Sequence, residues 1–327
     1  MKPEENLSSR QRYDTMSFKA IWANNTPYSK FLISVGIILI SAVFFTLIGT
    51  FLASVIFGVD TAQLASLMTN LENPSNIKVL KMMQTVSAIG TFIVPPFVLA
   101  WLFHPAPLSF LSIDKKPATT ASFMIIAMLM LAIPLINHLG ELNSYFHLPS
   151  ALKAVEDWMK SSEEQAARIT EAFLIMTSPS ELIFNLFMIA LIPAIGEELL
   201  FRGIVQNIFS SWLKNNHAAV WLSAILFSAM HMQFYGFIPR LMLGVMLGYL
   251  LVWSGNIWWP ILAHFVNNAA AVIFTYLFQN NLTGFDPDKI GVGADQVMTV
   301  MLSLSFTAIL LFLLHKEGRK NRLLSEE

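Results

Sequence analysis

The sequence predicts an all-α protein, a polytopic transmembrane helical bundle of about eight spans with amphipathic helices on its surface. Of 327 residues, 55% are hydrophobic and only 13% are charged, whereas an average soluble domain has about 25% charged residues. Long apolar runs recur along the chain, and the first of them, residues 31–59, contains no charged residue. Such a chain lacks the charged surface that water requires, so lipid is expected to surround much of it.

The individual spans are predicted from the apolar runs. About 20 residues cross roughly 30 Å of hydrocarbon as a helix that rises about 1.5 Å per residue. With boundaries that can shift by several residues, the runs are 31–59, 87–103, 120–138, 181–200, 218–235, 237–253, 257–278 and 297–315. The break at residues 236–239, between the fifth and sixth runs, is the weakest boundary.

The chain is interpreted as one membrane domain with four segments. A polar cytoplasmic N-terminal segment (1–30) precedes N-terminal transmembrane helices with an outer connection (31–177). Core helices that hold the intramembrane polar residues follow (178–278). An outer loop, the last span and a basic cytoplasmic tail (279–327) complete the chain.

Basic residues at both ends of the apolar region predict the orientation. They are Lys2, Arg10, Arg12, Lys19, Lys30, Lys316, Arg319, Lys320 and Arg322. Positive flanks favour the cytoplasmic side, and an even number of spans places both termini there. No apolar stretch precedes Phe31, so the first span is expected to remain as an anchor rather than to be cleaved as a signal peptide.

The outer connection is predicted to contain a helix on the membrane surface. Over residues 161–176, helical periodicity places four apolar residues on one face: Ala166, Ile169, Phe173 and Met176. A lid over a substrate entrance is the alternative role for this helix. After it, Ser178 and Glu181 have capping-box spacing with Pro179 at the first helical position, which predicts the start of the fourth span.

Composition also excludes several classes of function. The net charge of −1 argues against nucleic acid as a partner, because binding to phosphates needs a basic surface. The chain has no cysteine, which excludes disulfides, thiolate nucleophiles and cysteine-based zinc sites.

Ionisable side chains within the apolar runs are the strongest functional signal. At a helix centre each costs at least ~2.5–3.5 kcal/mol, and here they gather between residues 197 and 268. Glu198 and Arg202, four residues apart on one helix face, predict an ion pair, which alone could serve only to pin its helix to a neighbour. Glu197 points about 100° away and lacks that partner. A spare carboxylate in a poorly hydrated pocket suits a general base.

Two histidines and an asparagine accompany these charges. His231 ends the fifth run, while His264 and Asn268 share one face of the seventh, where both can donate to a developing oxyanion. A lone histidine in an apolar helix is more often a packing residue than a catalyst. Charges in hydrocarbon are stabilised by meeting each other, so we expect the six polar side chains to converge on one water-containing cavity.

Straight spans conflict with that convergence. They place Glu197 and His264 in the cytoplasmic half and His231 nearer the outer end. Convergence requires the fifth helix to tilt, or its boundary to extend past Gly236.

These polar groups resemble, in order, the three motifs of the CPBP intramembrane protease family, which includes the type II CAAX prenyl proteases and bacterial proteins linked to bacteriocin self-immunity. The resemblance covers about residues 178–271, and the matching motifs are Glu197-Glu198-x-x-x-Arg202, Phe227-x-x-x-His231 and His264-x-x-x-Asn268. It implies an α-helical integral membrane peptidase.

The resemblance also implies a role for each position. Glu197 activates a water that His231 helps to hold. His264 and Asn268 stabilise the oxyanion of the tetrahedral intermediate. Glu198 and Arg202 support the geometry of Glu197.

Metal dependence has two interpretations. Metal-independent glutamate chemistry is favoured, because the sequence contains no His-Glu-x-x-His helix. The alternative is a catalytic zinc, since two histidines and one glutamate form a known zinc ligand set. Its ligands would be Glu197, His231 and His264, and Glu198 would then become the base.

The favoured function is therefore an intramembrane endopeptidase of a bacterial cytoplasmic membrane, hydrolysing a peptide bond near the membrane in an apolar or lipidated peptide or protein. Membrane lipid is the expected surrounding partner, and the substrate itself is not predicted. Two alternatives stay open, a proton- or solute-coupled transporter and a non-catalytic membrane scaffold. The single polar cluster, without an inverted repeat of interrupted helices, argues against a transporter.

Overall fold

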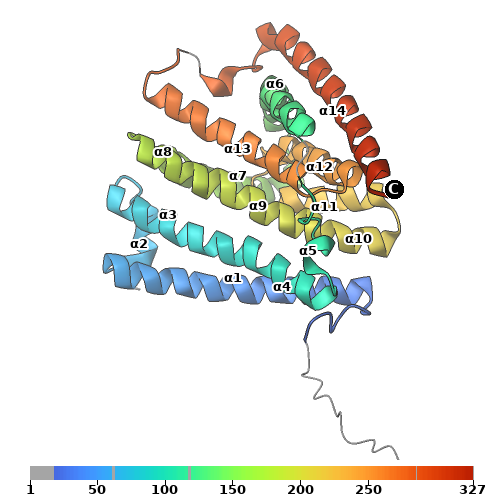
Figure 1. The fold of residues 1–327 in the computed structure, drawn as a ribbon. Coiled ribbons are helices and arrows are strands. Elements are labelled where there is room, and N and C mark those ends of the chain that lie inside the picture. The colour runs from blue at the N-terminus through green and yellow to red at the C-terminus, as the bar shows by residue number, and fades with distance from the viewer. Residues whose placement is uncertain (1–17, 61–62, 117–118, 285, 327) are drawn as a thin grey trace, which may run out of the picture.

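The computed structural model describes residues 18–60, 63–116, 119–284 and 286–326. Within these ranges every regular element is a helix, and the helices pack into one bundle (Figure 1). The predicted all-α fold is therefore confirmed. The basic residues Lys2, Arg10 and Arg12 lie outside the described ranges.

Seven helices of the described chain are long and apolar enough to cross a membrane, which makes the protein an integral, multi-pass membrane protein. They are Pro27–Phe57, Pro74–Phe103, Thr119–Ser144, Pro179–Leu213, Phe237–Ser254, Trp258–Gln279 and Ala294–Lys320. The sixth and seventh predicted spans, 237–253 and 257–278, differ from the observed helices by one residue at one or both boundaries. Most of the others are longer than predicted, because their polar ends continue the helix beyond the apolar run.

The fifth predicted span was wrong in its extent. Helix α11 (Asn216–Met230) has 15 residues, or about 22 Å at 1.5 Å per residue, and ends before His231 instead of continuing to residue 235. Residues 231–236 form a turn, and α12 (Phe237–Ser254) follows it. The two helices form a hairpin whose tip lies inside the bundle, which removes the conflict over the depth of His231.

The fourth predicted span was too short. Helices α8 (Pro179–Asn185), α9 (Ile192–Glu198) and α10 (Gln206–Leu213) join through π-helical segments η4 (Leu186–Leu191) and η5 (Leu199–Val205). The result is one helix of 35 residues. It continues past the charged residues because they are paired within the bundle, so Glu197 lies near the middle of this helix and not at its end.

Helix starts follow local sequence chemistry. Thr26, Asn73 and Ser178 each cap a helix whose next residue is proline, and each side chain accepts a backbone N–H of the first turn. Proline fits there because the first helical N–H has no intrahelical partner. The start of the fourth span was therefore predicted correctly.

The remaining helices complete the bundle around this long helix. Helix α1 (Pro27–Phe57) packs against α3 (Pro74–Ala88), η2 (Ile89–Ile93) and α4 (Val94–Phe103), while α6 (Thr119–Ser144) packs against α13 (Trp258–Gln279) and α14 (Val297–Glu326). Short elements between them are α2 (Leu64–Thr69), α5 (Pro107–Phe110), η3 (Ser150–Leu152), η6 (Pro287–Lys289) and η7 (Ala294–Gln296). The start of α1 and the end of α14 lie at the same end of the bundle (Figure 1).

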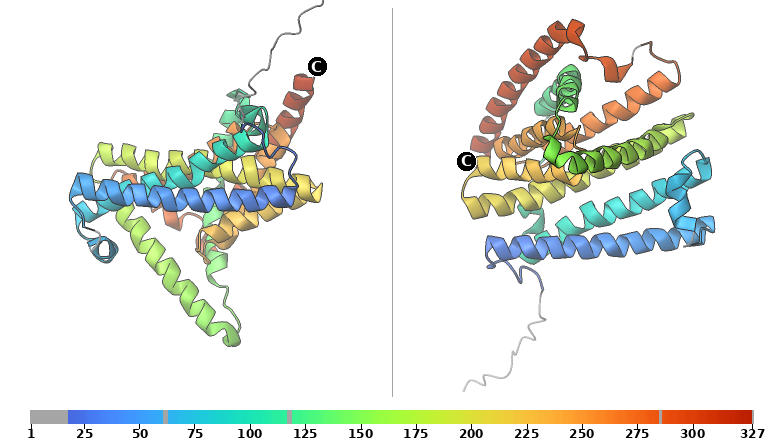
Figure 2. Two further views of the ribbon diagram at one scale, coloured as in Figure 1. Left: turned by 90° about the horizontal axis from the view of Figure 1, so that it is seen from below. Right: turned by 180° about the vertical axis from the view of Figure 1, so that it is seen from behind.

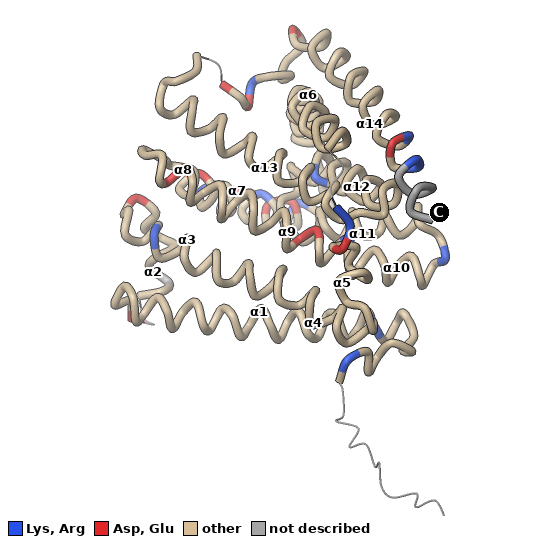
Figure 3. The backbone as a smooth tube through the Cα atoms, viewed as in Figure 1, with Lys and Arg blue, Asp and Glu red and all other residues tan. Residues whose placement is uncertain are grey.

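Charge is almost absent from the outer helices. Figure 3 shows Lys, Arg, Asp and Glu mainly near helix ends and in a group near α9 and α12. On α1, large apolar side chains face outward, among them Ile40, 72% exposed, and Phe51, 67% exposed. Such a surface suits lipid rather than water.

The outer connection contains the predicted helix. Helix α7 (Lys153–Leu174) begins before the predicted residue 161 and ends before the predicted residue 176. Of the residues predicted to share one face, Phe173 is buried, and Met176 is buried but lies after the end of the helix. Figure 2 shows α7 running obliquely to the spans, with its N-terminal end projecting from the bundle. Its position on a membrane surface stays a prediction.

Candidate active site

The buried ion pair between Glu198 and Arg202 holds three helices together. Arg202 Nη1 donates to Glu198 Oε1 at 3.0 Å, and the two side chains are 0% and 1% exposed. Arg202 Nη2 donates to the carbonyl of Gly244 on α12 at 2.9 Å, and its guanidinium lies 4.7 Å from the centre of the Phe227 ring on α11. The pair therefore does pin its helix to neighbours, as the structural interpretation of the sequence proposed.

Helices α11 and α12 lie close together, and this allows Arg202 to reach the carbonyl of Gly244. A Cβ at Gly244 would lie 3.1 Å from Ala224 Cβ and 3.3 Å from Ala224 Cα, closer than ordinary packing allows. Glycine at this position lets α12 lie against α11 and brings the Gly244 carbonyl within reach of Arg202.

Glu198 has a second function, which is to orient His264. Its Oε1 lies 2.7 Å from His264 Nδ1. Because a carboxylate can only accept, Nδ1 carries the proton and Nε2 faces the opposite way, into the site. His264 is only 4% exposed, so this hydrogen bond fixes both its tautomer and its ring plane.

His231 is positioned by the end of α11. It is the C-terminal cap of that helix, and its Nδ1 lies 2.8 Å from the carbonyl oxygen of Phe227. A carbonyl can only accept, so Nδ1 again carries the proton and Nε2 is left free. In both histidines, an acceptor binds the Nδ1–H and leaves Nε2 free to face the site.

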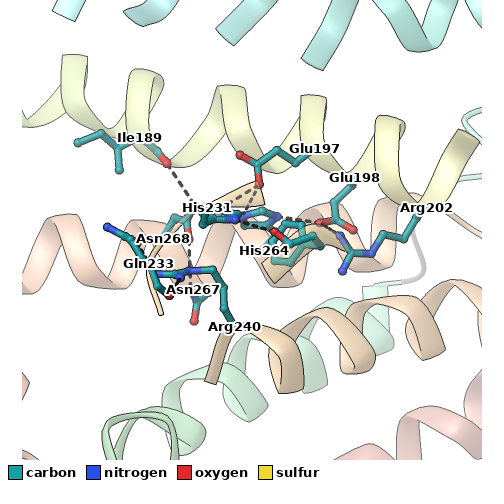
Figure 4. Close-up of polar contacts among 11 residues, drawn as sticks. Ile189, Glu197, Glu198, Arg202, His231, Gln233, Arg240, His264, Asn267 and Asn268 are labelled. Carbon is teal, nitrogen blue, oxygen red and sulfur yellow. Dashed lines mark hydrogen bonds and ion pairs between the residues drawn. The ribbon is translucent and has the colours of Figure 1, made fainter. Parts of the chain in front are cut away.

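Glu197 is the point at which these atoms converge. Its Oε2 lies 4.0 Å from His231 Nε2 and 4.0 Å from His264 Nε2. This oxygen is buried without a hydrogen-bond partner in the described structure. Figure 4 shows the carboxylate facing the two imidazoles, with Glu198 next to it on the same helix and Arg202 about one turn further along. A separation of 4.0 Å suits one bridging water, which sits about 2.8 Å from each partner.

Asn268 holds the π-helical part of the long helix. Pro193 has no N–H to donate to the carbonyl of Ile189 four residues earlier, and Asn268 Nδ2 donates to that carbonyl at 3.1 Å instead. Asn267 Nδ2 donates to Asn268 Oδ1 at 3.1 Å. One N–H of Asn268 is therefore already bound, and the other can serve a ligand.

Three polar residues near the site were missed from the sequence. Asn143, 4% exposed at the end of α6, donates to Phe234 O at 2.9 Å and accepts from Ile238 N at 2.7 Å. Glu163 on α7 accepts from Tyr235 N at 2.8 Å. Both hold the 231–236 turn that carries His231.

The third missed residue is Arg240, which lies in α12 and binds Gln233 in the same turn. A single arginine inside a predicted span is a signal that could have identified it. Asn143 and Glu163 gave no such signal, because their importance depends on which turn they contact.

The zinc interpretation was tested against the geometry. Two ligands about 2.0–2.1 Å from a tetrahedral zinc are roughly 3.4 Å apart, less than the 4.0 Å between Glu197 Oε2 and each imidazole nitrogen. No group of three His, Asp or Glu side chains in the described residues is close enough to hold a metal ion. Both separations are wider than those around a bound zinc, so no step is derived through one, and metal dependence stays a prediction.

A buried carboxylate facing two oriented imidazoles, within a helical membrane bundle, defines a site of the hydrolase type. Comparison with known families agrees with this class. Residues 179–270 match the model of the family described as type II CAAX prenyl endopeptidase Rce1-like. The chain thus contains an Rce1-like domain, and the resemblance found in its motifs is confirmed.

One relative shares sequence similarity with part of the chain. The chain is similar to the uncharacterized protein YpbD of Bacillus subtilis (strain 168), with 28% identity over 120 residues. This match covers 36% of the chain and 57% of YpbD, so it spans little more than half of that protein. No solved structure gives a significant match.

Removing Arg202 is expected to destabilise the fold. Arg202→Ala leaves Glu198 buried without its guanidinium and the Gly244 carbonyl without its donor. Breaking a buried pair in this way costs about 3–5 kcal/mol, which a denaturant titration of the purified protein in detergent would measure as a lower free energy of unfolding. Arg319→Ala, at an exposed position of α14, is the matched control. Equal stability of the two variants would contradict the structural role of the pair.

Removing Asn143 is expected to loosen the turn that carries His231. Asn143→Ala leaves Ile238 N without its acceptor and Phe234 O with Phe237 N as its remaining donor, so backbone amides 232–238 should exchange with deuterium faster, by about tenfold or more for a loss of about 1.5 kcal/mol or more. Asn137→Ala is the control, because Asn137 on the same helix binds Pro287 O and Ile290 O instead. Unchanged exchange at 232–238 would show that the clamp is not needed.

Proposed function

We propose that this protein is an intramembrane endopeptidase in which Glu197 is the general base. The observation that carries the proposal is the position of Glu197 Oε2, without a hydrogen bond and 4.0 Å from the Nε2 atoms of His231 and His264. Glu198 Oε1, the Arg202 guanidinium and the Nδ1 atoms of both histidines take part in hydrogen bonds that orient the site. The Rce1-like domain supports the same class of reaction.

In the proposed first step, a water bridges Glu197 and His231. Glu197 takes one proton from it as the water oxygen attacks the carbonyl carbon of the scissile peptide bond. The C=O electron pair moves to oxygen and gives a tetrahedral oxyanion. Glu197 then delivers its proton to the leaving nitrogen, the C–N bond breaks, and a carboxylate and an amine are released.

His264 stabilises the oxyanion in this proposal. In its doubly protonated form, present before the water attacks, His264 donates a hydrogen bond from Nε2–H to the oxyanion and keeps that proton, while Glu198 behind its Nδ1–H offsets the positive charge. The N–H of Asn268 that does not bind Ile189 O is the second donor. Arg202 has no direct contact with the oxyanion in this proposal, and its role is to hold Glu198 in place.

The substrate is proposed to be an apolar or lipidated peptide that enters from the membrane. A cavity of about 580 Å³ lies between α1, α3 and α8, and its lining combines apolar side chains such as Phe57 and Phe184 with charged ones such as Lys81 and Glu181. A larger one of about 1050 Å³ lies between α2, α7 and the end of α13, about two turns beyond Asn268. The two share Leu71, Glu72, Ala172 and Ile175 as walls, so a bulky apolar group and the chain attached to it could occupy adjoining spaces. We place both termini on the cytoplasmic side, as their basic flanks predict.

If Glu197 is the general base, replacing it should reduce cleavage without lowering the stability of the protein. Glu197→Gln should reduce cleavage by at least 10²–10⁴-fold, the usual contribution of a general base, in liquid-chromatography assays of peptide cleavage by proteoliposomes. Because Oε2 makes no hydrogen bond, its thermal unfolding midpoint should not fall. A non-catalytic scaffold instead predicts a change in stability with no cleavage in either form, and a transporter predicts loss of a proton-coupled flux with cleavage unaffected.

Metal-independent chemistry predicts that chelators have no effect. The rate of cleavage after incubation with 1,10-phenanthroline and dialysis should equal that of the untreated enzyme. The non-chelating 1,7 isomer controls for binding of the aromatic compound itself. Loss of the rate only with the chelating isomer, and its recovery with added zinc, would assign Glu197, His231 and His264 as zinc ligands.

A further inference from the structure

Lys81 is a buried cation, away from Glu197 and the two histidines, that the mechanism above does not use. It lies on α3 within the span Pro74–Phe103, about 10 Å along the helix from its first residue at 1.5 Å per residue. It is 8% exposed, and it lines the cavity of about 580 Å³ between α1, α3 and α8. The end of α1 and the starts of α3 and α8 lie at the same end of the bundle (Figure 1, Figure 2), so the cavity lies at that end too.

The Lys81 ammonium group has no hydrogen-bond or ion-pair partner within the ranges that the structure describes. Glu181, in the first turn of α8, is close enough to attract the charge. Its Oε2, however, accepts from the backbone N–H and the hydroxyl of Thr177, at 2.7 Å and 3.1 Å. The charge of Lys81 is therefore attracted by a neighbour but not bound by it.

Extension of the side chain to water does not account for Lys81. A lysine near the end of a span usually places its ammonium group at the aqueous interface. Lys78, one turn earlier on α3, is exposed and can do so, whereas Lys81 is buried. An ammonium group that is largely shielded from water and binds no anion is costly, so Lys81 needs a partner from outside the chain.

The charges around the cavity indicate what kind of partner fits. Lys78 and Lys81 are three residues apart, so they share one face of α3, and both line the cavity. Two carboxylates, those of Glu72 and Glu181, line it as well. A purely anionic ligand would meet both carboxylates, whereas a ligand that carries a phosphate and a cation matches all four side chains.

The apolar part of the lining indicates that this ligand is a lipid. Phe57, at the end of α1, and Phe184, on α8, both line the cavity, and they are 42% and 41% exposed. Both belong to membrane-spanning helices, so their exposed surfaces face hydrocarbon. A ligand with its charged group at Lys81 and its apolar part beside these rings would extend from the cavity into the membrane, as a phospholipid can and a soluble ion cannot.

We propose that this cavity binds the head group of a phospholipid of the phosphoethanolamine type. Lys81 and Lys78 hold its phosphate, and Glu181 and Glu72 hold its ammonium group. A lysine ammonium has three N–H donors, and hydrogen bonds between charged donors and phosphate are strong. The primary ammonium of the head group can donate to carboxylates, which a quaternary choline group cannot. The proposal does not depend on the proposed function, and a substrate group that enters the same cavity would displace the lipid.

The test measures lipid binding to the full-length protein in a mild detergent by native mass spectrometry. The probes are phosphatidylethanolamine, phosphatidylcholine and phosphatidylglycerol with the same acyl chains, and inorganic phosphate. The wild type should bind phosphatidylethanolamine about tenfold or more tightly than the other two lipids. Lys81→Met should weaken that binding about 10- to 100-fold, the range for a charge-assisted hydrogen bond. Glu181→Gln, which keeps an acceptor for Thr177 N, should lower the affinity to that for phosphatidylcholine.

Lys316→Met is the matched control, because Lys316 is exposed near the end of a span at the other end of the bundle. It should bind lipid as the wild type does. In detergent without lipid, Lys81→Met should unfold at the same temperature as the wild type or a higher one, since it removes an unpaired buried charge.

Three results would overturn the proposal. They are equal binding of the three lipids, tighter binding of phosphatidylglycerol, and an unchanged affinity in Lys81→Met. Displacement of the bound lipid by inorganic phosphate alone would also contradict it, because the site would then recognise free phosphate. None of these measurements involves cleavage, so the endopeptidase proposal is tested separately.

Discussion

The hydrogen-bonded chain Arg202–Glu198–His264, buried within hydrocarbon, is the interaction on which the rest of the site depends. Each link is short, at 3.0 Å and 2.7 Å, and its members are 4% exposed or less. In such surroundings an unpaired member would be strongly destabilising. The long helix, α12 and α13 are therefore bound to one another by the same atoms that fix the orientation of His264.

The short α11–α12 hairpin supplies the other half of the geometry. Because α11 has only 15 residues, the chain turns back inside the bundle and presents His231 at mid-depth. Irregular backbone at that depth is tolerated only where protein or a water-filled cavity satisfies its polar groups. Asn143 and Glu163 satisfy three such groups, at residues 234, 235 and 238, which makes the outer connection part of the support for the site.

The sequence predicted the fold class and which ionisable side chains would lie together, because an uncharged apolar run and a charge inside it are both local signals. It predicted that Glu197, His231 and His264 would meet, and they do. It did not predict how α11 ends, since the apolar run continues to residue 235 while the helix does not. It assigned Asn268 to the oxyanion alone, although Asn268 also binds the carbonyl that Pro193 leaves free. That bond depends on which helix faces α13, which no pattern within one helix specifies.

The two adjacent carboxylates of the site differ in their surroundings: Glu198 is held in place by its partners, and Glu197 faces the two histidines. Glu198 is bound on one oxygen by Arg202 and by His264, so its charge is compensated and its position is fixed. Glu197 is adjacent in sequence but points about 100° away, beyond those partners, and its Oε2 stays without a hydrogen bond. A buried acceptor without a donor costs roughly 1–3 kcal/mol, and Glu198 Oε2 also lacks a donor, but it is Glu197 Oε2 that lies 4.0 Å from the Nε2 atoms of both histidines. Stabilisation by Glu198 and its partners offsets that cost, and the free oxygen of Glu197 is what a bound water would meet.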